Sequence, residues 1–554
     1  MFRALAPGLN PIGFGPADAL ELALAALLVA IALLGRRWIE PRYRRLAAKT
    51  TWCMVLLAVL PVVLRLMLLS RHPVPTPNVY DEFSHLLAAD TLRHFRLANP
   101  PHALPQFFET FFVLQTPTYS SIYPIGQGLA LAIGWTFGLP WAGVLISMAA
   151  FCSLCYWMLR AWTTPAWALT GGLLAVIQFG PLCAWTNGYW GGTLAAAAGC
   201  LVFGALPRLR EARRARDAVL LGVGLGLHLL IRQFESVFLL LAVLLFVLPS
   251  LRALAKPIAI AALVTLPAVF VTLLQNKLVT DSWTTLPEML SQYQYGVPAS
   301  LTFQSPQVPH RELTPQQAMD YKMQLSFHQG PETVESYLLR LEYRVRFYRF
   351  FLLPPLYIAA LAFLMTLREY RFTWVALTLA IFALGINFFP AFQTHYLAAL
   401  TCLFVLVAVT GLERITRLTI RGERPGHEAA LLLLILCGAH FLFWYGIHTV
   451  DNETVRRYET WNFINHRTPT ARSIVAQELD RVPGQLLVFV RYAPQHIFQD
   501  EWVYNGANID ASRIVWARDL GDAENEKLVR YFPARSALLL EPDARPMKLE
   551  PYKP

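Results

Sequence analysis

Residues 78–127 read NVYDEFSHLLAADTLRHFRLANPPHALPQFFETFFVLQTPTYSSIYPIGQ and form the first long polar break in a chain that is otherwise mostly apolar. The stretch opens with two adjacent carboxylates, Asp81 and Glu82, carries a further acid, Glu109, and returns to apolar sequence at Tyr123 and Pro124. An ionisable group beside hydrocarbon is costly to keep, so acids at a membrane boundary predict a functional site. The rest of the chain is interpreted as a scaffold for this loop.

Composition places the chain among membrane proteins. Of 554 residues, 55% are hydrophobic and 15% are charged, whereas soluble domains carry about 25% charged residues. Apolar runs of roughly 16–21 residues recur, which is the length needed to cross a bilayer. We therefore expect an all-α polytopic membrane protein with about twelve spans, including a single crossing over residues 347–367. The cysteines all lie in apolar runs and are expected to be small buried residues rather than zinc ligands.

The distribution of charge sets the expected orientation. The net charge is +11, but most basic residues fall in short loops between apolar runs, where they follow the positive-inside rule. We therefore expect no nucleic-acid partner. The arginine cluster from Arg36 to Arg45 places its loop in the cytoplasm, so residues 78–127 are expected on the outer face.

The sequence divides into two parts. Residues 1–450 are expected to form the membrane domain, with outer loops at 71–122 and 275–346. The spacing of apolar residues over 81–95 predicts a helix that lies along the membrane surface. The short, glycine-rich run 123–139 predicts a re-entrant or broken element.

Residues 451–554 differ in character from the rest. Runs at 485–492, 513–519 and 537–543 predict strands, and 525–531 predicts a helix. We expect a small α/β domain on the outer face. No glycine-rich phosphate loop accompanies these strands, so no nucleotide is expected there.

The acid pair suggests two kinds of chemistry. A carboxylate at the outer surface can act as a general base on an acceptor hydroxyl or amine, or it can bind a divalent cation. Adjacent acids cannot both point the same way, so Asp81 is expected to face the reaction and Glu82 to support it. The alternative is that both simply favour the N-terminus of a helix. A divalent cofactor stays open, but the ligand set is too thin to assign a metal.

Basic residues near the outer ends of apolar runs complement the acids. Arg232 lies in IRQFES, Arg344 and Arg346 precede an apolar run, and His395 lies in QTHY. A guanidinium matches the geometry of phosphate oxygens, so these residues are expected to bind an anionic lipid phosphate. The alternatives are pairing with nearby acids or anchoring at the lipid headgroups.

At this point the chain resembles a known superfamily. YDEFSHLLAAD, FFET, TPTYSSIYPIGQG, IRQFES and QTHY, within residues 50–412, are similar in order to segments of the GT-C glycosyltransferases, such as the protein O-mannosyltransferases and the bacterial aminoarabinose transferases. The resemblance implies a helical bundle roofed by outer loops and a sugar donor carried on polyprenyl or dolichyl phosphate. It also implies that Asp81 is the catalytic base and that Glu109 assists acceptor or donor placement.

The chain departs from that family around Glu109, which matches the second acid of the family's pattern. The aminoarabinose transferases have Glu-Lys-Pro where this chain has Glu109, Thr110 and Phe111, so the lysine that contacts phosphate is absent. The usual Pro-Pro at the re-entry is Pro-Ile here. The phosphate contact is therefore expected to come from Arg232 or Arg344.

These features together predict a membrane glycosyltransferase of the bacterial inner membrane. Its expected partners are the lipid bilayer, a polyprenyl-phosphate-linked sugar and a glycan, lipid or protein acceptor, with the active site and C-terminus on the periplasmic side. The alternatives are a non-enzymatic transporter or flippase of lipid-linked glycans and a glycan polymerase or ligase.

Overall fold

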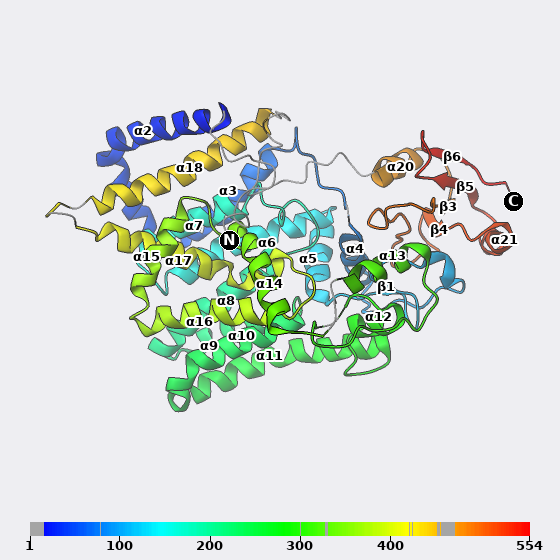
Figure 1. Cartoon of the computed structure of the whole chain (residues 1–554), viewed down its shortest axis with the longest axis horizontal. Helices are drawn as coiled ribbons and strands as arrows, with labels where there is room; N and C mark the ends of the chain where they lie inside the picture. The colour runs from blue at the N-terminus through cyan, green and yellow to red at the C-terminus, as the bar shows by residue number, and fades with distance from the viewer. Residues whose placement is uncertain are drawn as a thin grey trace.

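A computed structural model describes residues 16–77, 79–299, 301–326, 331–419, 422–423, 425–450, 455 and 471–553. The expected start of the C-terminal domain, at 451–470 apart from Val455, lies outside the described residues. The molecule is elongated, with the apolar helices gathered in one part and a small sheet at the opposite end (Figure 1).

The chain is a multi-pass membrane protein built from apolar helices. Helices α2 and α18 pack side by side along one edge of the bundle (Figure 1). The helices of this part are α2 (Pro16–Ala47), α3 (Thr50–Met67), α5 (Ile125–Trp135), α6 (Pro140–Leu159), α7 (Pro165–Phe179), α8 (Thr193–Ala212), α9 (Ala215–Leu229), α10 (Gln233–Val247), α11 (Leu251–Thr280), α15 (Leu356–Phe363), α16 (Tyr370–Ile386), α17 (Thr401–Thr416) and α18 (Gly426–Val450).

Fewer helices pass a length test than the sequence predicted. Seven of the described helices are long and apolar enough to cross a membrane, or eight if one bent pair counts as a span. Three further apolar helices, α5, α7 and α16, have 10–17 residues. The expected single crossing over 347–367 is not one straight helix, because the chain bends by 112° between Phe351 and Leu356. Pro354 and Pro355 lie in this break, and proline interrupts helical hydrogen bonding.

Residues 233–280 pass the length test as one run but contain two helices of opposite direction. A Cβ atom on Gly222 of α9 would lie 2.5 Å from the carbonyl oxygen of Ala261, and one on Gly226 would lie 3.0 Å from Ala268 Cβ. The contact positions rise together along both chains, so α9 and α11 run parallel. Helix α10, which connects them in the sequence, must therefore run in the opposite direction.

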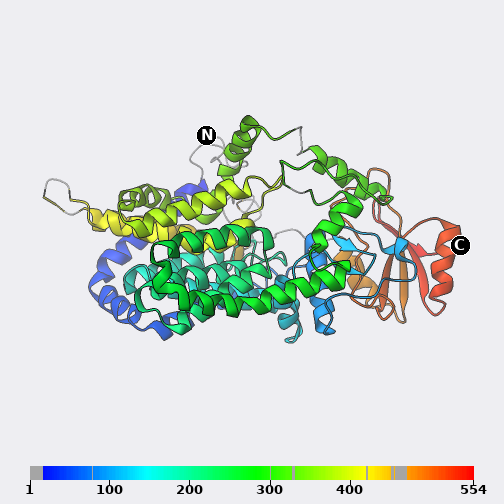
Figure 2. The ribbon, with the colours of Figure 1, turned by 90° about the horizontal axis from the view of Figure 1, so that it is seen from below.

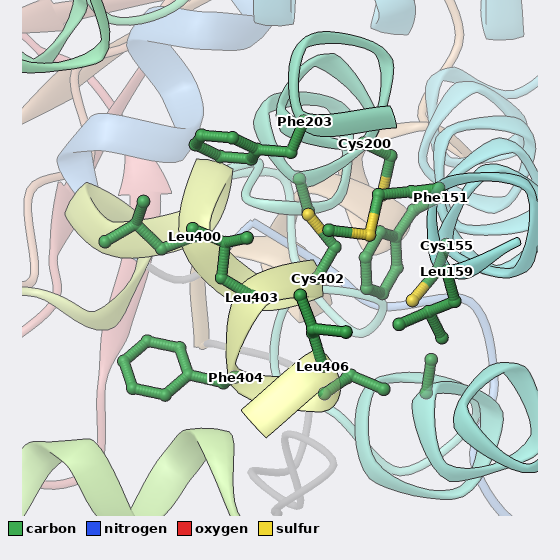
Figure 3. Packing of buried hydrophobic residues seen from close by; sticks show 14 of the residues in the cluster. Phe151, Cys155, Leu159, Cys200, Phe203, Leu400, Cys402, Leu403, Phe404 and Leu406 are labelled. Atoms are coloured by element: carbon green, nitrogen blue, oxygen red, sulfur yellow. The ribbon is translucent and has the colours of Figure 1, made fainter. Parts of the chain in front are cut away.

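Close approach of small residues holds the bundle together. A Cβ atom on Gly199 of α8 would lie 1.9 Å from the carbonyl oxygen of Ala399, so only glycine fits there. Such contacts are typical of membrane helices, where packing replaces the hydrophobic effect. Figure 3 shows Cys155, Cys200 and Cys402 meeting in this core. All seven cysteines are buried and unbridged, as predicted for core residues.

One end of the helical bundle is covered by short elements from the two predicted outer loops. The first outer loop (71–122) contributes α4 (Tyr80–Arg93), η1 (Pro105–Phe108) and the strand pair β1 (Val113–Leu114) and β2 (Ser120–Ser121). The second outer loop (275–346) contributes α12 (Pro287–Tyr295), α13 (Pro315–Ser326) and α14 (Val334–Val345). Five short 3-10 turns complete the description; besides η1 they are η2 (Leu248–Ser250), η3 (Arg346–Phe351), η4 (Leu364–Thr366) and η5 (Thr394–Leu400).

The helix predicted over 81–95 is α4, and other parts of the protein bury one side of it. Ser84, Leu87 and Ala89 of α4 are buried, because α4 packs against α5 and against the C-terminal sheet. The predicted re-entrant element is the short helix α5, which packs against α6 so tightly that a Cβ atom on Gly143 would lie 1.9 Å from the carbonyl oxygen of Ala130.

The C-terminal domain, described over residues 471–553, is an α/β unit. Its sheet has the order β4-β3-β5-β6, with β3 parallel to β4 and β5 and with β6 antiparallel. The predicted strands and helix are confirmed, and α20 and β6 are additional. The elements are α20 (Ala471–Leu479), β3 (Leu486–Val490), β4 (Ile514–Arg518), α21 (Asp522–Tyr531), β5 (Ser536–Glu541) and β6 (Lys548–Pro551).

One face of this sheet packs on the first outer loop. Leu487 and Phe489 of β3 share an apolar cluster with Leu87 of α4 and with Phe107 and Phe108. Figure 2 shows the sheet beside α4, η1 and the strands of the first outer loop. The C-terminal domain therefore covers the same end of the helical bundle as the first outer loop.

Candidate active site

The start of α4 separates the two adjacent acids. The carboxylate of Glu82 accepts hydrogen bonds from the backbone nitrogens of Val79, at 3.4 Å, and Tyr189, at 2.7 Å. Asp81 instead accepts a hydrogen bond from the hydroxyl of Tyr123. Glu82 thus caps the helix and holds the 186–192 loop, which leaves Asp81 alone at the site. This placement suits the supporting position expected for Glu82, and its assignment as a catalytic residue stays a prediction.

Two glycines of α5 bring Asp81 close to the turn between α9 and α10. A Cβ atom on Gly128 would lie 2.8 Å from Ala88 Cβ of α4, so these helices are in close contact. The backbone nitrogen of Gly126 donates to the carbonyl oxygen of Leu230 at 2.7 Å. The residue two positions later in this turn is Arg232, which caps α10.

Arg232 lies in the surroundings of Asp81 and contacts other side chains there. Its guanidinium lies 3.9 Å from the Glu235 carboxylate and 5.0 Å from the ring centroid of Tyr396, and it makes no hydrogen bond with the residues that the structure describes. Arg232 also lowers the pKa of Asp81. A partly buried guanidinium with free donors beside an acid suits an anionic ligand.

Burial makes the carboxylate of Asp81 a stronger base. Removal from water raises the pKa of the half-buried Asp81 to about 6, although the Tyr123 hydroxyl and Arg232 both oppose this rise. A carboxylate with a pKa near the working pH is a better base than an ordinary one, because it holds a proton more strongly and is still ionised at pH 7.

His85 is a site residue that the sequence interpretation missed. It lies one helical turn after Asp81 and stacks on Tyr123 at a centroid distance of 4.3 Å. Its Nδ1 atom is buried with no hydrogen-bond partner among the described residues. Burial and then Arg232 lower the pKa of His85 to about 3, so the imidazole is neutral at pH 7. The spacing of four residues in YDEFSH, which places both side chains on one helix face, was the available signal.

Glu109 ties the two outer loops together. Its carboxylate pairs with Arg311 and accepts a hydrogen bond from the Tyr295 hydroxyl at 2.8 Å. Burial raises its pKa, whereas Arg311 lowers it. Because both carboxylate oxygens are engaged, Glu109 positions the loops in this structure, and its expected part in acceptor or donor placement stays a prediction.

The other predicted phosphate ligands differ from Arg232. The Arg344 guanidinium is buried and donates to the carbonyl oxygens of Ile386, at 2.8 Å, and Phe389. It therefore caps the C-terminus of α16 in this structure, and its expected contact with phosphate stays a prediction. Arg346 lies 3.6 Å from the ring centroid of Tyr343 and hydrogen-bonds its hydroxyl.

The predicted His395 does join the site. It is buried at the start of η5, with its ring 5.5 Å from that of Trp190. Trp190 in turn lies beside Asp81 and contributes to lowering its pKa. The structure thus gathers Asp81, Arg232 and His395 from distant parts of the chain.

Two carboxyl groups with raised pKa values lie near Arg232 and Asp81. Burial raises the pKa of Glu288 in α12 to about 7, and the carboxylate of Glu235 adds to the rise. Burial and Asp81 raise the pKa of Asp320 in α13 to about 7. Among the described residues there is no group of three His, Cys, Asp or Glu side chains that could hold a metal ion.

The comparisons with known proteins bear on the fold. No protein-family model matches the chain, and no curated protein matches it. ArnT from Cupriavidus metallidurans bound to undecaprenyl phosphate matches with a TM-score of 0.50 and 12% identity, over 89% of this chain and 93% of that chain. The chain therefore shares the GT-C fold with this structure.

Other solved structures with the GT-C fold match less closely. ArnT in the apo state matches with a TM-score of 0.49 at 12% identity, over 89% of this chain and 93% of that one. The oligosaccharyltransferase AglB from Archaeoglobus fulgidus, in complex with an inhibitory peptide and a dolichol-phosphate, gives 0.38 at 12% identity, over 89% and 69%. The expected helical membrane fold with a small C-terminal α/β domain is confirmed.

Proposed function

We propose that this protein is a glycosyltransferase that moves a sugar from a polyprenyl-phosphate donor to an acceptor at the periplasmic face of the bacterial inner membrane. The transferase class agrees with the GT-C fold and with ArnT, whose solved complex contains undecaprenyl phosphate. The C-terminal domain, which packs on the same loop as Asp81, would lie on the periplasmic side with the site.

The observation that carries this proposal is that the packing of α4 on α5 and the bond from Gly126 to Leu230 bring Arg232 into the surroundings of Asp81. A donor of this kind is a phosphodiester with one negative charge, and Arg232 offers a guanidinium with free donors to hold it. Asp81, with its pKa raised to about 6, supplies a base beside the phosphate site. Of the other arginines predicted to bind phosphate, Arg344 donates to backbone carbonyl oxygens and Arg346 stacks on Tyr343.

The transfer would proceed by one displacement. Asp81 takes the proton of the acceptor hydroxyl while that oxygen attacks the anomeric carbon of the donor sugar. The bond between this carbon and the phosphate oxygen breaks, and the polyprenyl phosphate leaves with the electron pair. Arg232 balances the extra negative charge on the leaving phosphate. Such stabilisation of developing charge contributes strongly to catalysis in a site away from water. A single displacement inverts the anomeric centre.

Binding of undecaprenyl phosphate to the purified protein in lipid nanodiscs tests this proposal. We expect saturable binding to the wild type and to Asp81→Asn, and binding about tenfold or more weaker for Arg232→Ala, because a charge-assisted contact contributes roughly 1.5–3 kcal/mol. Arg346→Ala is the matched control, because Arg346 stacks on Tyr343 and should not contact the phosphate. Absence of binding, or equal losses in both arginine variants, would contradict the assigned donor site.

A further inference from the structure

Helix α14 of the second outer loop exposes several large apolar side chains. Val334, Leu338, Leu339 and Tyr343 are each between 55% and 78% exposed. Single exposed apolar residues are ordinary on a protein surface, but these four belong to one helix of 12 residues. A concentrated patch of this kind marks a surface that meets a membrane or another protein.

One side of α14 rests on the end of an apolar helix of the bundle. Arg344 donates to the carbonyl oxygen of Ile386 at 2.8 Å, and Arg340 donates to that of Asn387 at 2.8 Å. Both carbonyl groups lie at the C-terminus of α16, next to which α14 is drawn in Figure 1. The end of an apolar helix in a membrane protein lies near the edge of the hydrocarbon layer. Helix α14 therefore lies close to that edge.

Helix α14 also runs across the direction of the next apolar helix in the chain. The stretch Val334–Phe351 is bent by 112° against Leu356–Thr366. The latter stretch carries exposed apolar side chains, among them Leu361 and Met365, as expected of a helix in contact with lipid. A helix bent by 112° from one that enters the bilayer runs roughly along the membrane surface.

The charged side chains of α14 agree with this orientation. With about 3.6 residues per turn, Arg340 and Arg344 share the side that faces α16. Glu335 and Glu342 lie on the opposite side, and both are exposed. The exposed apolar side chains occupy the two flanks between these sides, with Val334 and Leu338 on one flank and Leu339 and Tyr343 on the other. A charged side that faces water, with apolar side chains beside it, is typical of a helix in the membrane interface.

We propose that α14 lies in the bilayer interface at the end of the bundle that carries Arg232, with its two apolar flanks among the lipid headgroups and upper acyl chains. The partner is the phospholipid leaflet, because the exposed flanks of α14 lead through η3 directly into the exposed apolar face of α15. This inference goes beyond the proposed function and does not depend on it. It places part of the predicted second outer loop in the membrane.

This position connects the lipid leaflet with the surroundings of Arg232. Arg344 of α14 donates to the carbonyl oxygen of Phe389. The ring of Phe389 lies 5.7 Å from that of Tyr396, and the Arg232 guanidinium lies 5.0 Å from the Tyr396 ring centroid. A helix anchored in the interface therefore keeps this row of stacked side chains at a fixed depth relative to the bilayer.

Fluorescence quenching by brominated lipid tests the proposal on the full-length protein. Single cysteines are introduced by Leu338→Cys, Leu339→Cys and Glu342→Cys and labelled with bimane, which is possible because all seven native cysteines are buried. The protein is reconstituted in phosphatidylcholine vesicles with or without bromine on the acyl chains, and iodide serves as the quencher in water. Leu361→Cys in α15 is the lipid-facing control, and Lys527→Cys in α21 is the water-facing control.

We expect brominated lipid to quench the labels of both leucine variants about twofold or more over that of Glu342→Cys, because the flanks meet acyl chains and Glu342 points to water. If the leucine labels respond like that of Lys527→Cys, to iodide alone, water surrounds α14 and the proposal is overturned. If they respond to neither quencher, a protein covers the flanks, which also overturns it. Lipid quenching of Glu342→Cys as strong as that of Leu361→Cys would place α14 inside the hydrocarbon and contradict an interfacial position. None of these outcomes depends on undecaprenyl phosphate, so the proposed donor site is tested separately.

Discussion

Replacement of Asp81 by Asn should abolish transfer while making the protein more stable. Asn is close in shape, and its side-chain oxygen can still accept the hydrogen bond from the Tyr123 hydroxyl. It cannot take a proton from the acceptor, and loss of a general base typically costs a factor of about 10²–10⁴ in rate. The same substitution removes a carboxylate that folding forces into a poorly hydrated position.

The size of the stability gain follows from the pKa of Asp81. Folding raises this pKa from 3.8 to about 6, which corresponds to about 3 kcal/mol at ~1.4 kcal/mol per unit. Asp81 is half-buried, so screening by water reduces the cost to about 1–2 kcal/mol. A raised carboxyl pKa means that the folded state binds the proton more tightly. The cost of ionised Asp81 is therefore complete above pH 6, declines as the pH falls and is absent below pH 3.8.

Thermal unfolding and donor turnover test these two effects together. Wild type and Asp81→Asn are compared at pH 7 and pH 4 by intrinsic fluorescence, and loss of any co-purified lipid-linked donor is followed by mass spectrometry. We expect a higher midpoint for Asp81→Asn at pH 7, a smaller difference at pH 4 and no turnover. Unchanged turnover in folded Asp81→Asn protein would refute the assignment of the base. A lower midpoint at pH 7 would refute the argument from burial.

Two further predictions concern how the site is held together. Arg518→Ala should cost about 3–5 kcal/mol of stability, because it leaves the buried carboxylate of Glu501 unpaired, and limited proteolysis should then release the C-terminal domain. Gly126→Ala should cost about 1–3 kcal/mol and weaken undecaprenyl phosphate binding, because the new Cβ atom would lie 2.6 Å from the carbonyl oxygen of Leu230.

Matched controls distinguish these effects from general damage. Arg530→Ala removes an exposed pair with Glu526 and should change stability by less than about 1 kcal/mol. Gly446→Ala adds a Cβ atom that meets nothing within 4 Å, so lipid binding should be unaffected. Equal proteolysis of both arginine variants, or equal binding by both glycine variants, would contradict the proposed positioning roles.

Local patterns predicted the elements of this fold well. The apolar runs, the helix after Asp81 and the parallel strands all depend on neighbouring residues, and the structure contains them. Strand β6 was missed because KLEP is polar and includes Pro551, as expected of an edge strand rather than a core one. The helix α4 was placed on the membrane surface because its cover, the C-terminal sheet, comes from far along the sequence.

The candidate site was predictable only in part, for the same reason. Arg232 and Arg344 have similar sequence surroundings, each at the outer end of an apolar run. What distinguishes them is that Arg344 donates to carbonyl oxygens at the end of α16, whereas Arg232 lies close enough to Asp81 to lower its pKa.

The docking of the C-terminal domain on the first outer loop has a consequence for the making of the protein. The loop that carries Asp81 leaves the ribosome more than 400 residues before Arg518, whose guanidinium nitrogen donates to the carbonyl oxygen of Glu109 at 2.5 Å. Contacts between such distant segments form late in folding. The surroundings of Asp81 are therefore complete only after the C-terminal domain has been made and has packed on the first outer loop.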